Sequence, residues 1–526
     1  MDNTGDSQAN NEVNKVTDLQ SDEWHRLSPI SIVYFTVQSV LNFANASFYI
    51  LAAIAINFSK VKENPIISLI VVCCILVFFI VMGILNFWFY RFKVGKARIE
   101  IRQGVFKKSH IDLPFERIQN VKLSQPLYYR INDYSCIELE TAGSAKQEAK
   151  IVALKTNLAE KFRLKILESS AQEQGDEQAS SLDDKQTKFS DEVVLNRRSM
   201  QDLIIHGITN NRVWIFLGAL APFYNSISEV VSEIFISIGF DVEYYFSLET
   251  QAWWELGLHI LSVVMVVMLL VVMLSVAGAI LMFYNYTLSK TNDRYIRRSG
   301  LLTKHEVSMK LSRIQIMVQA QDWLDVLLGR VNLSFEQNTS GAANPNKSGE
   351  QMSNKLLVPS VTLNESRQLM NDAMPSQRLS EQNFKAISKR YIFRGILLLA
   401  LPLSVLPLAF LFQDNLLAAL ILASLIFGLI TVAYCISWKR WGYNYDNEYI
   451  YIRSGFFGVN YYCFPIYKVQ QAQFKQSAFI KPYNLATLKV VLASGAKRIP
   501  YMPATEVRSL IDAMLDKLVV DKRSWM

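Results

Sequence analysis

Four polar side chains in two strongly apolar segments could carry chemistry inside a membrane. Asn225, Glu229 and Glu233 recur every fourth residue, so a helix places them on one face. His259 stands in the next apolar segment, at a matching depth from the opposite direction. Carboxylates and an imidazole at such a place could bind a cation, relay a proton or hold a lipid headgroup. The alternative is that the helix ends early and leaves both glutamates in the outer headgroup zone.

A second polar row lies in the first apolar segment. Gln38, Asn42 and Asn45 fall on one helical face, and amides on a membrane helix usually join it to a neighbouring helix. A substrate path is the alternative use of this row. Pro402 and Pro407 in a later segment predict kinks, which transporters use and ordinary helix bundles tolerate.

The sequence lacks the local signatures of the common enzyme classes. It contains no GxxxxGK[ST] phosphate loop, no GxGxxG after a strand and no GxSxG turn. His305 and Glu306 are not followed by the second histidine of HExxH, and the five cysteines form no CxxC pair. We therefore expect no catalytic residue, no metal site and no cofactor.

The composition indicates which elements must position these residues. Of 526 residues, 51% are hydrophobic and 19% are charged, and the mean hydropathy is +0.16. Soluble domains carry about 25% charged residues, so part of this chain is solvated by lipid. This balance excludes a disordered or nucleic-acid-coating chain. Six apolar runs approach or exceed the roughly 20 residues that cross a bilayer, at about 30–58, 65–90, 213–240, 254–284, 391–412 and 416–438.

The six runs come in pairs with short gaps, so each pair predicts a helical hairpin. Lys and Arg collect beside the long polar segments, whereas the second turn has acidic residues and no Lys or Arg. The positive-inside rule then predicts that both termini and all long polar segments are cytoplasmic. Residues 1–22 hold a single Lys, and we expect no cleavable signal peptide.

One pattern recurs after each hairpin. It begins with Arg-x-Gly, continues with a first glutamine fifteen residues past the glycine, and ends with a second glutamine twenty-one past it. A basic and a branched residue precede each first glutamine. The glycines are Gly104, Gly300 and Gly455; the first glutamines are Gln119, Gln315 and Gln470; the second are Gln125, Gln321 and Gln476. Three matching spacings at three places predict three copies of one unit, a hairpin followed by a small domain.

The small domain reads as mostly β. Apolar residues alternate around each Arg-x-Gly, and a polar residue before Gly predicts a hairpin turn in which glycine supplies a positive φ. Further strands are predicted at 135–141, 331–335 and 487–493, with later turns at Gly143, Gly341 and Gly495. Amphipathic stretches at 158–167, 363–374 and 505–518 close the copies. These elements predict a small barrel or sandwich plugged by its C-terminal helix.

The predicted fold is a multi-pass α-helical membrane protein with six transmembrane helices as three hairpins and three small cytoplasmic β-barrel domains, each capped by a helix. The boundaries are a polar N-terminus 1–23, hairpin 24–92, domain 93–168, linker 169–192, interfacial helix and hairpin 193–285, domain 286–374, linker 375–390, hairpin 391–440 and domain 441–522.

This order of motifs, from about Trp24 to Leu518, resembles the bacterial pleckstrin-homology-like (PH-like) domain membrane proteins of the YdbT type. The resemblance implies PH-like barrels, a plasma-membrane location and no established enzymatic activity. It also implies envelope maintenance or resistance to membrane-active agents, often with a smaller membrane partner carrying one PH-like domain; self-association is the alternative. The second copy departs from the pattern, since Lys310 replaces the proline seen at Pro114 and Pro465 and a polar insert spans 338–354.

Basic residues of the three domains are candidate contacts for lipid headgroups, phosphate or a protein partner. Beside an anionic inner leaflet, each would be attracted by about 1 kcal/mol. The alternatives are that these charges only set topology and solubility, or that a peptide binds along an open barrel edge. The candidates are Arg102, Lys107, Lys108, Arg117, Arg298, Lys304, Arg313, Arg453 and Lys468.

The sequence leaves two candidate functions. The first is a non-enzymatic scaffold or accessory factor of the cell envelope that contacts inner-leaflet lipids, a protein partner, or both. The second is a transporter or lipid-moving protein that uses the polar faces of the first and third helices.

Overall fold

The computed structural model describes residues 23–46, 65–95, 98–105, 107–141, 149–172, 192–209, 236, 253–291, 293–337, 355–411 and 416–520. Over these residues, four helices are long and apolar enough to cross a membrane, at Leu69–Phe89, Gly257–Phe283, Arg390–Ala409 and Leu416–Arg440. A shorter apolar helix covers Ser31–Phe43. The predicted third span, 213–240, lies outside the described residues except for Ile236, so the structure supports four of the six predicted spans.

The helices form close pairs at the ends nearest the sheets. Helix α2 (Ser31–Ala46) packs on α5 (Pro65–Phe89), α8 (Met200–Thr209) packs on α12 (Trp253–Phe283), and α15 (Arg390–Gly395) leads through a π-helical turn, Ile396–Ala400, into α16 (Leu401–Leu411), which packs on α17 (Leu416–Arg440). Gly83, Gly207 and Gly395 stand at the crossings, where an added Cβ would lie 2.2–2.5 Å from the facing helix. Small residues permit such close backbone approach. The π-helical turn ends two residues before Pro402, whose backbone nitrogen cannot donate a hydrogen bond within the helix.

Each repeat folds as a unit of seven strands and a closing helix. In unit 1, β1 (His25–Arg26), β2 (Arg91–Val94), β3 (Arg98–Gln103) and β4 (Ser109–Pro114) form one antiparallel sheet. Strands β5 (Ile118–Pro126), β6 (Tyr134–Thr141) and β7 (Ala149–Lys155) form the second layer, and α7 (Thr156–Gln172) closes the unit. Because β1 precedes the hairpin and pairs with β2, the hairpin is inserted between the first two strands of its unit.

Units 2 and 3 repeat this plan. Unit 2 holds β8 (Val193–Arg197), β9 (Thr287–Thr291), β10 (Arg294–Ser299), β11 (Thr303–Lys310), β12 (Ile316–Gln321), β13 (Arg330–Glu336), β14 (Lys355–Thr362) and α14 (Leu363–Ala373). Unit 3 holds β15 (Lys385–Ala386), β16 (Gly442–Tyr445), β17 (Tyr449–Ser454), β18 (Val459–Pro465), β19 (Val469–Lys475), β20 (Leu485–Leu492), β21 (Gly495–Pro503) and α18 (Ala504–Val520). The strands and closing helices predicted from sequence therefore form, with boundaries that differ by a few residues.

The sheets run across unit boundaries, which the sequence did not predict. Strand β5 of unit 1 pairs with β11 of unit 2, and β12 of unit 2 pairs with β18 of unit 3, each making one seven-stranded sheet. The registers are equivalent, since Gln125 faces Lys304 and Gln321 faces Val459, and both facing residues stand four past a signature glycine. The small domains predicted from sequence are therefore joined through shared sheets, and each small unit extends its buried core against its neighbour.

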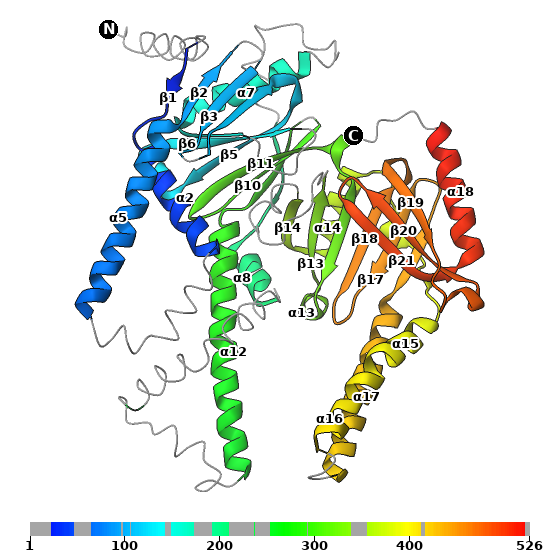
Figure 1. The fold of residues 1–526 in the computed structure, drawn as a ribbon. Coiled ribbons are helices and arrows are strands. Elements are labelled where there is room, and N and C mark those ends of the chain that lie inside the picture. The colour runs from blue at the N-terminus through cyan, green and yellow to red at the C-terminus, as the bar shows by residue number, and fades with distance from the viewer. Residues whose placement is uncertain are drawn as a thin grey trace.

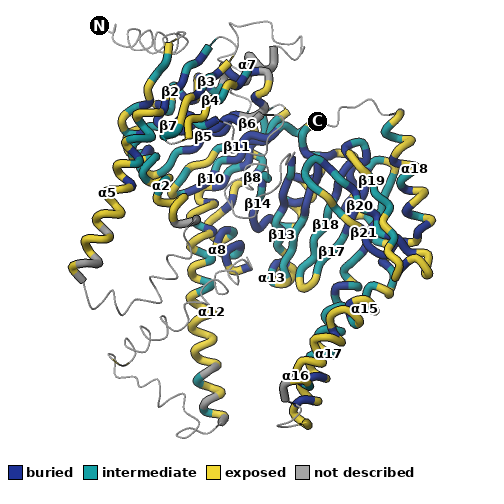
Figure 2. Tube along the Cα trace, viewed as in Figure 1, coloured by how far each residue is buried: buried dark blue, intermediate teal, exposed yellow. Residues whose placement is uncertain are grey.

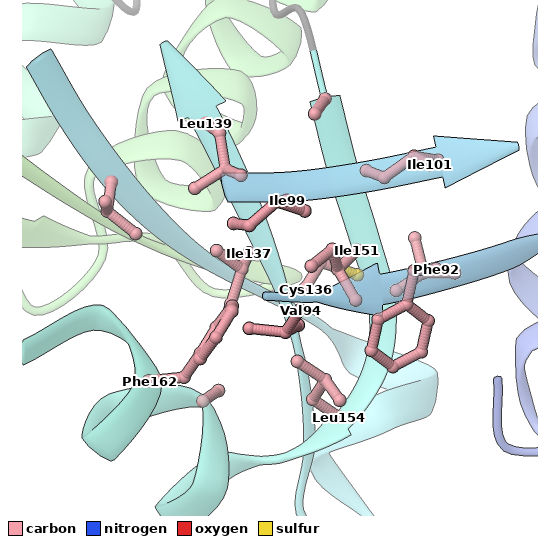
Figure 3. Close-up of a cluster of buried hydrophobic side chains, with 14 of the residues drawn as sticks. Phe92, Val94, Ile99, Ile101, Cys136, Ile137, Leu139, Ile151, Leu154 and Phe162 are labelled. Atoms are coloured by element: carbon pink, nitrogen blue, oxygen red, sulfur yellow. The ribbon is translucent and has the colours of Figure 1, made fainter. Parts of the chain in front are cut away.

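The three units share one side of the molecule while their helices extend in a common direction (Figure 1). Burial follows this division: the sheets enclose the buried residues and the helix surfaces are mostly exposed (Figure 2). Figure 3 shows the core of unit 1, where Phe92, Ile99, Ile137 and Ile151 meet Phe162 of α7. The apolar surface left on the helices is what a lipid environment would cover.

The geometry of the turns at the Arg-x-Gly motifs explains why glycine is required there. Gly104 and Gly300 have φ values of +105° and +117°, as the hairpin prediction required. Gly455 lies outside that region, so the prediction of a positive φ is wrong for unit 3. There the close approach of the backbone requires glycine, because an added Cβ would lie 2.0 Å from the carbonyl oxygen of Gly458.

Candidate functional site

The Arg-x-Gly turns lie at the end of each unit where the membrane helices join the sheet. In unit 1, Arg102 pairs in register with Arg91, the first strand residue after α5. In unit 2, the backbone N–H of Gly300 donates to the Tyr284 carbonyl oxygen, just past α12, at 2.9 Å. In unit 3, the Arg453 Nε donates to the Arg440 carbonyl oxygen at the end of α17, at 3.1 Å. We call this end of the sheets the membrane-facing end.

The basic candidates divide between two ends. Arg102, Lys107, Lys108, Arg298, Lys304 and Arg453 stand at or beside the membrane-facing turns. The other three, Arg117, Arg313 and Lys468, lie in the 3₁₀ turns Phe115–Arg117, Leu311–Arg313 and Ile466–Lys468, which follow the opposite ends of β4, β11 and β18. The structure therefore does not bring the nine candidates together as one surface.

Several of these cations already have structural partners. Lys468 is 2% exposed, and its Nζ donates to the carbonyl oxygens of Ser312 and Ile314 across the junction of units 2 and 3. Arg453 donates to the last carbonyls of α17, which stabilises the end of that helix. Burial beside Arg294 lowers the pKa of Arg313, whose side chain is half-buried.

The remaining membrane-facing side chains combine basic and apolar groups. Lys107, Lys108 and Lys304 are exposed, and the Arg102 guanidinium lies 4.1 Å from the centre of the Trp24 ring. Exposed apolar residues follow the signature glycines, namely Leu302 at 49%, Phe456 at 40% and Phe457 at 61% exposed. Aromatic and basic residues together are typical of a surface at the bilayer interface.

A polar pocket of ≈ 490 Å³ opens between units 1 and 2 at this end. Its lining includes Gln125, Arg130 and Thr156 of unit 1 and Arg298 and Lys304 of unit 2. Its wall includes Tyr284 and Asn285, which directly follow α12. The pocket therefore lies beside the C-terminal end of α12, where that helix joins the sheet. We call it the junction pocket.

Glu306 in the wall of the junction pocket is an ionic link between the units. Its carboxylate accepts hydrogen bonds from Arg163 of α7 and from Arg298 Nε, the latter at 3.0 Å. Burial alone would raise the pKa of Glu306, but the two guanidinium groups hold it below its usual value. Arg298 also donates to Glu192, and this bond lowers the pKa of Glu192. Sequence reasoning missed Arg163, Glu192 and Glu306, because pairs 106 and 143 residues apart leave no local signal.

The second signature glutamines have structural partners. Gln321 Nε2 donates to the Arg330 carbonyl oxygen at 3.0 Å, and Gln476 Nε2 donates to the equivalent Leu485 carbonyl oxygen at 2.9 Å. Gln125 instead donates to Thr156 Oγ1 at 3.3 Å, inside the junction pocket. The first glutamines differ: Gln315 is 1% exposed, Gln470 is exposed, and the Gln119 side chain is not among those described.

The proposed intramembrane site receives little support. Gln38 Nε2 donates to Asn42 Oδ1 at 3.2 Å on an exposed face of α2. His259 lies half-buried in α12, where its carbonyl oxygen accepts a bond from Ser262. Asn225, Glu229 and Glu233 lie outside the described residues. Within the part of the chain that the structure describes, no three His, Cys, Asp or Glu side chains are grouped to hold a metal ion.

The fold of seven strands and a closing helix, three times over, agrees with a comparison against protein families. Residues 40–170, 235–361 and 396–518 match the family described as bacterial PH domain. The chain belongs to this family. The three matches cover more than half of the chain and coincide with the three repeats, so each unit is a bacterial PH domain joined to membrane helices.

Two relatives share parts of this plan. The chain is 22% identical over 421 residues to the UPF0699 transmembrane protein YdbT of Bacillus subtilis (strain 168), a match that covers 77% of this chain and 80% of that protein. It is 34% identical over 76 residues to the UPF0699 transmembrane protein YdbS of the same organism, covering 14% of this chain and 48% of that protein. No solved structure matches the chain. The protein is thus a membrane protein of the YdbT type with three bacterial PH domains.

Proposed function

We propose that the chain is a non-enzymatic scaffold of the plasma membrane, with both termini in the cytoplasm, that maintains the cell envelope against membrane-active agents. One observation carries this proposal: in all three units the Arg-x-Gly turn lies where the second hairpin helix meets the sheet. In the proposed arrangement, exposed side chains such as Lys107, Lys108 and Phe457 lie against the inner leaflet. Each basic residue there gains about 1 kcal/mol from an anionic leaflet.

Leaflet contact is testable by fluorescence quenching. Phe457→Cys, labelled with an environment-sensitive fluorophore in the full chain in nanodiscs, should be quenched by phospholipids brominated near the headgroup. Arg117→Cys is the matched control, because Arg117 is also exposed but lies at the opposite end of its sheet. Equal quenching at both sites, or none at either, would contradict leaflet contact.

The scaffold and transporter functions differ in the residues they need. In cells that depend on the chain for survival under a membrane-active peptide, combined Lys107→Gln, Lys108→Gln, Phe456→Ser and Phe457→Ser should lower survival. Glu229→Gln with Glu233→Gln should leave survival unchanged. The reverse result would favour the transporter, whose candidate residues in the third helix lie outside the described part of the chain.

A protein partner is the second part of the proposal: a smaller membrane protein with one PH-like domain, or another copy of this chain. Strand β4 is an edge of the separate four-stranded sheet of unit 1, and β19 is an edge of the separate three-stranded sheet of unit 3. A strand edge offers unpaired backbone groups to a partner. A photoreactive residue at Gln473 of β19 should crosslink a partner in native membranes, whereas one at Gln319 of β12, already paired with β18, should crosslink only within the chain. A monomeric product from both positions would argue against edge docking.

A further inference from the structure

Arg130, in the lining of the junction pocket, has side-chain donors that the rest of the described chain leaves unpaired. It ends the short helix α6 (Leu127–Arg130) and lines the pocket. Its Nε and Nη2 atoms are buried, yet neither has a hydrogen-bond partner in the described part of the chain. Buried guanidinium donors are nearly always satisfied, because leaving them unpaired is costly. Such a group in the wall of an open pocket indicates a missing anionic partner.

The other charges of the pocket favour an anion near Arg130. Lys304 adds a second, exposed cation from unit 2. The carboxylate of Glu306 does not oppose it, because Arg163 and Arg298 already neutralise that group. Asp133 and Glu160 also line the pocket, but both are exposed and so are screened by solvent. The buried Arg130 donors are therefore less screened by solvent than the exposed carboxylates of Asp133 and Glu160.

The position of the pocket limits which anions can reach it. Tyr284, Asn285 and Gly300 in its wall stand immediately beyond α12, at the level of the bilayer surface. The phosphate of an inner-leaflet phospholipid lies at this level. Arginine suits phosphate because its planar fork of donors matches two phosphate oxygens at once. The polar row formed by Gln125, Thr156 and Ser135 lines the same wall and suits the hydroxyl-bearing part of a headgroup.

We propose that the junction pocket binds a phosphate group, held by Arg130 and Lys304, and that a phospholipid headgroup supplies it. The ligand would touch units 1 and 2 together and so stabilise their junction. This inference deepens the leaflet contact proposed above and rests on it for the source of the phosphate. The two proposals can fail independently, because the Phe457 quenching experiment reports on the turns and the experiment below reports on the pocket.

The test uses the full chain, delipidated in a non-ionic detergent, with calorimetric titration. The probes are dihexanoyl phosphatidylglycerol, inorganic phosphate, and dihexanoylglycerol, which lacks phosphate. Phosphatidylglycerol should bind saturably, and Arg130→Gln and Lys304→Gln should each weaken binding at least about tenfold, the loss of one charge-assisted contact. Arg117→Gln, an exposed arginine of the same unit at the opposite end, should bind as the unchanged chain does.

The probes also distinguish the two sources of phosphate. Binding of phosphatidylglycerol but not inorganic phosphate, lost in Arg130→Gln, supports the headgroup. Equal Arg130-dependent binding of inorganic phosphate supports the anion site and overturns the lipid source. Binding of dihexanoylglycerol equal to phosphatidylglycerol, or binding unaffected by both Arg130→Gln and Arg130→Met, would overturn the site. An unchanged thermal unfolding temperature in these variants excludes misfolding as the cause of any loss.

Discussion

Arg163 on α7 of the first unit donates a hydrogen bond to Glu306 on β11 of the second. Both side chains are mostly buried, at 14% and 20% exposed. This bond crosses the same junction as the β5–β11 ladder. It therefore joins two PH domains through residues that are 143 positions apart in the sequence. The stability of the fold should therefore respond to changes at this junction and at the residues that differ between units.

Removing the cation from this link should weaken the junction. Arg163→Gln is expected to destabilise the full chain by about 1.5–3 kcal/mol, the usual contribution of a charge-assisted bond. Arg98→Gln is the matched control, because its partner Asp112 is 43% exposed and surface pairs contribute little. Thermal unfolding of both variants in detergent measures the difference. Equal unfolding temperatures would show that the strand ladder alone holds the junction.

The same link predicts a dependence of stability on pH. Burial by itself raises the pKa of Glu306, but Arg163 and Arg298 lower it by more, so the pKa in the folded chain is below its usual value. A carboxyl group with a lowered folded pKa stabilises the fold above its unfolded pKa, and this contribution disappears as the pH falls through the folded value. The difference in unfolding temperature between the unchanged chain and Glu306→Gln should therefore shrink from about pH 5 to about pH 3. A constant difference over this range would mean that the charge of Glu306 does not matter.

Arg297 occupies a position where units 1 and 3 carry core isoleucines, Ile101 and Ile452. It is 4% exposed, and its Nε and Nη1 have no hydrogen-bond partner within the described residues. Burial lowers the pKa of Arg297, which reflects the same desolvation cost. Arg297→Ile should stabilise unit 2 by about 1–3 kcal/mol, measured as a higher unfolding temperature. Arg297→Ala, which leaves a cavity, should gain less; a loss of stability in Arg297→Ile would contradict the absence of a partner.

Gly300 should tolerate no side chain. Its φ is +117°, and an added Cβ would lie 2.0 Å from the Thr303 carbonyl oxygen. Gly300→Ala should therefore cost at least about 1–3 kcal/mol through backbone strain and the clash. Gly257→Ala is the control, since an added Cβ there meets no atom within 4 Å. Comparable unfolding temperatures for the two variants would mean that the turn can rearrange.

The proposed orientation in the membrane is testable with single cysteines on a background lacking the five native ones. Asn64→Cys and Thr250→Cys, in the predicted outer turns, should react with an impermeant maleimide in intact cells. Lys107→Cys, at the membrane-facing end of unit 1, should react only after lysis. Labelling of Lys107→Cys in intact cells would show that the orientation is the reverse of the proposed one, and it would contradict contact with the inner leaflet.

The sequence by itself determined the elements that depend on local pattern. Long apolar runs predicted the helices, alternation predicted the strands, and the Arg-x-Gly and glutamine spacing revealed the three units. These features are readable because residues close in the chain decide them: helix length, side-chain period and turn chemistry. Even so, the positive φ expected at Gly455 did not form, although Gly104 and Gly300, with an equally close approach to a carbonyl oxygen, have it.

Only the tertiary structure decided how the units join and where the candidate site lies. A two-residue strand such as His25–Arg26 has no periodic signal, and its partner Phe92 lies beyond an entire hairpin. The shared sheets pair β5 with β11 and β12 with β18, contacts that depend on backbone edges rather than on any motif. Long-range pairing likewise separated Arg117 and Lys468 from the membrane-facing residues and placed Arg130 and Lys304 in the lining of one pocket. Edge pairing and burial act between segments far apart in the chain, so no local pattern encodes them.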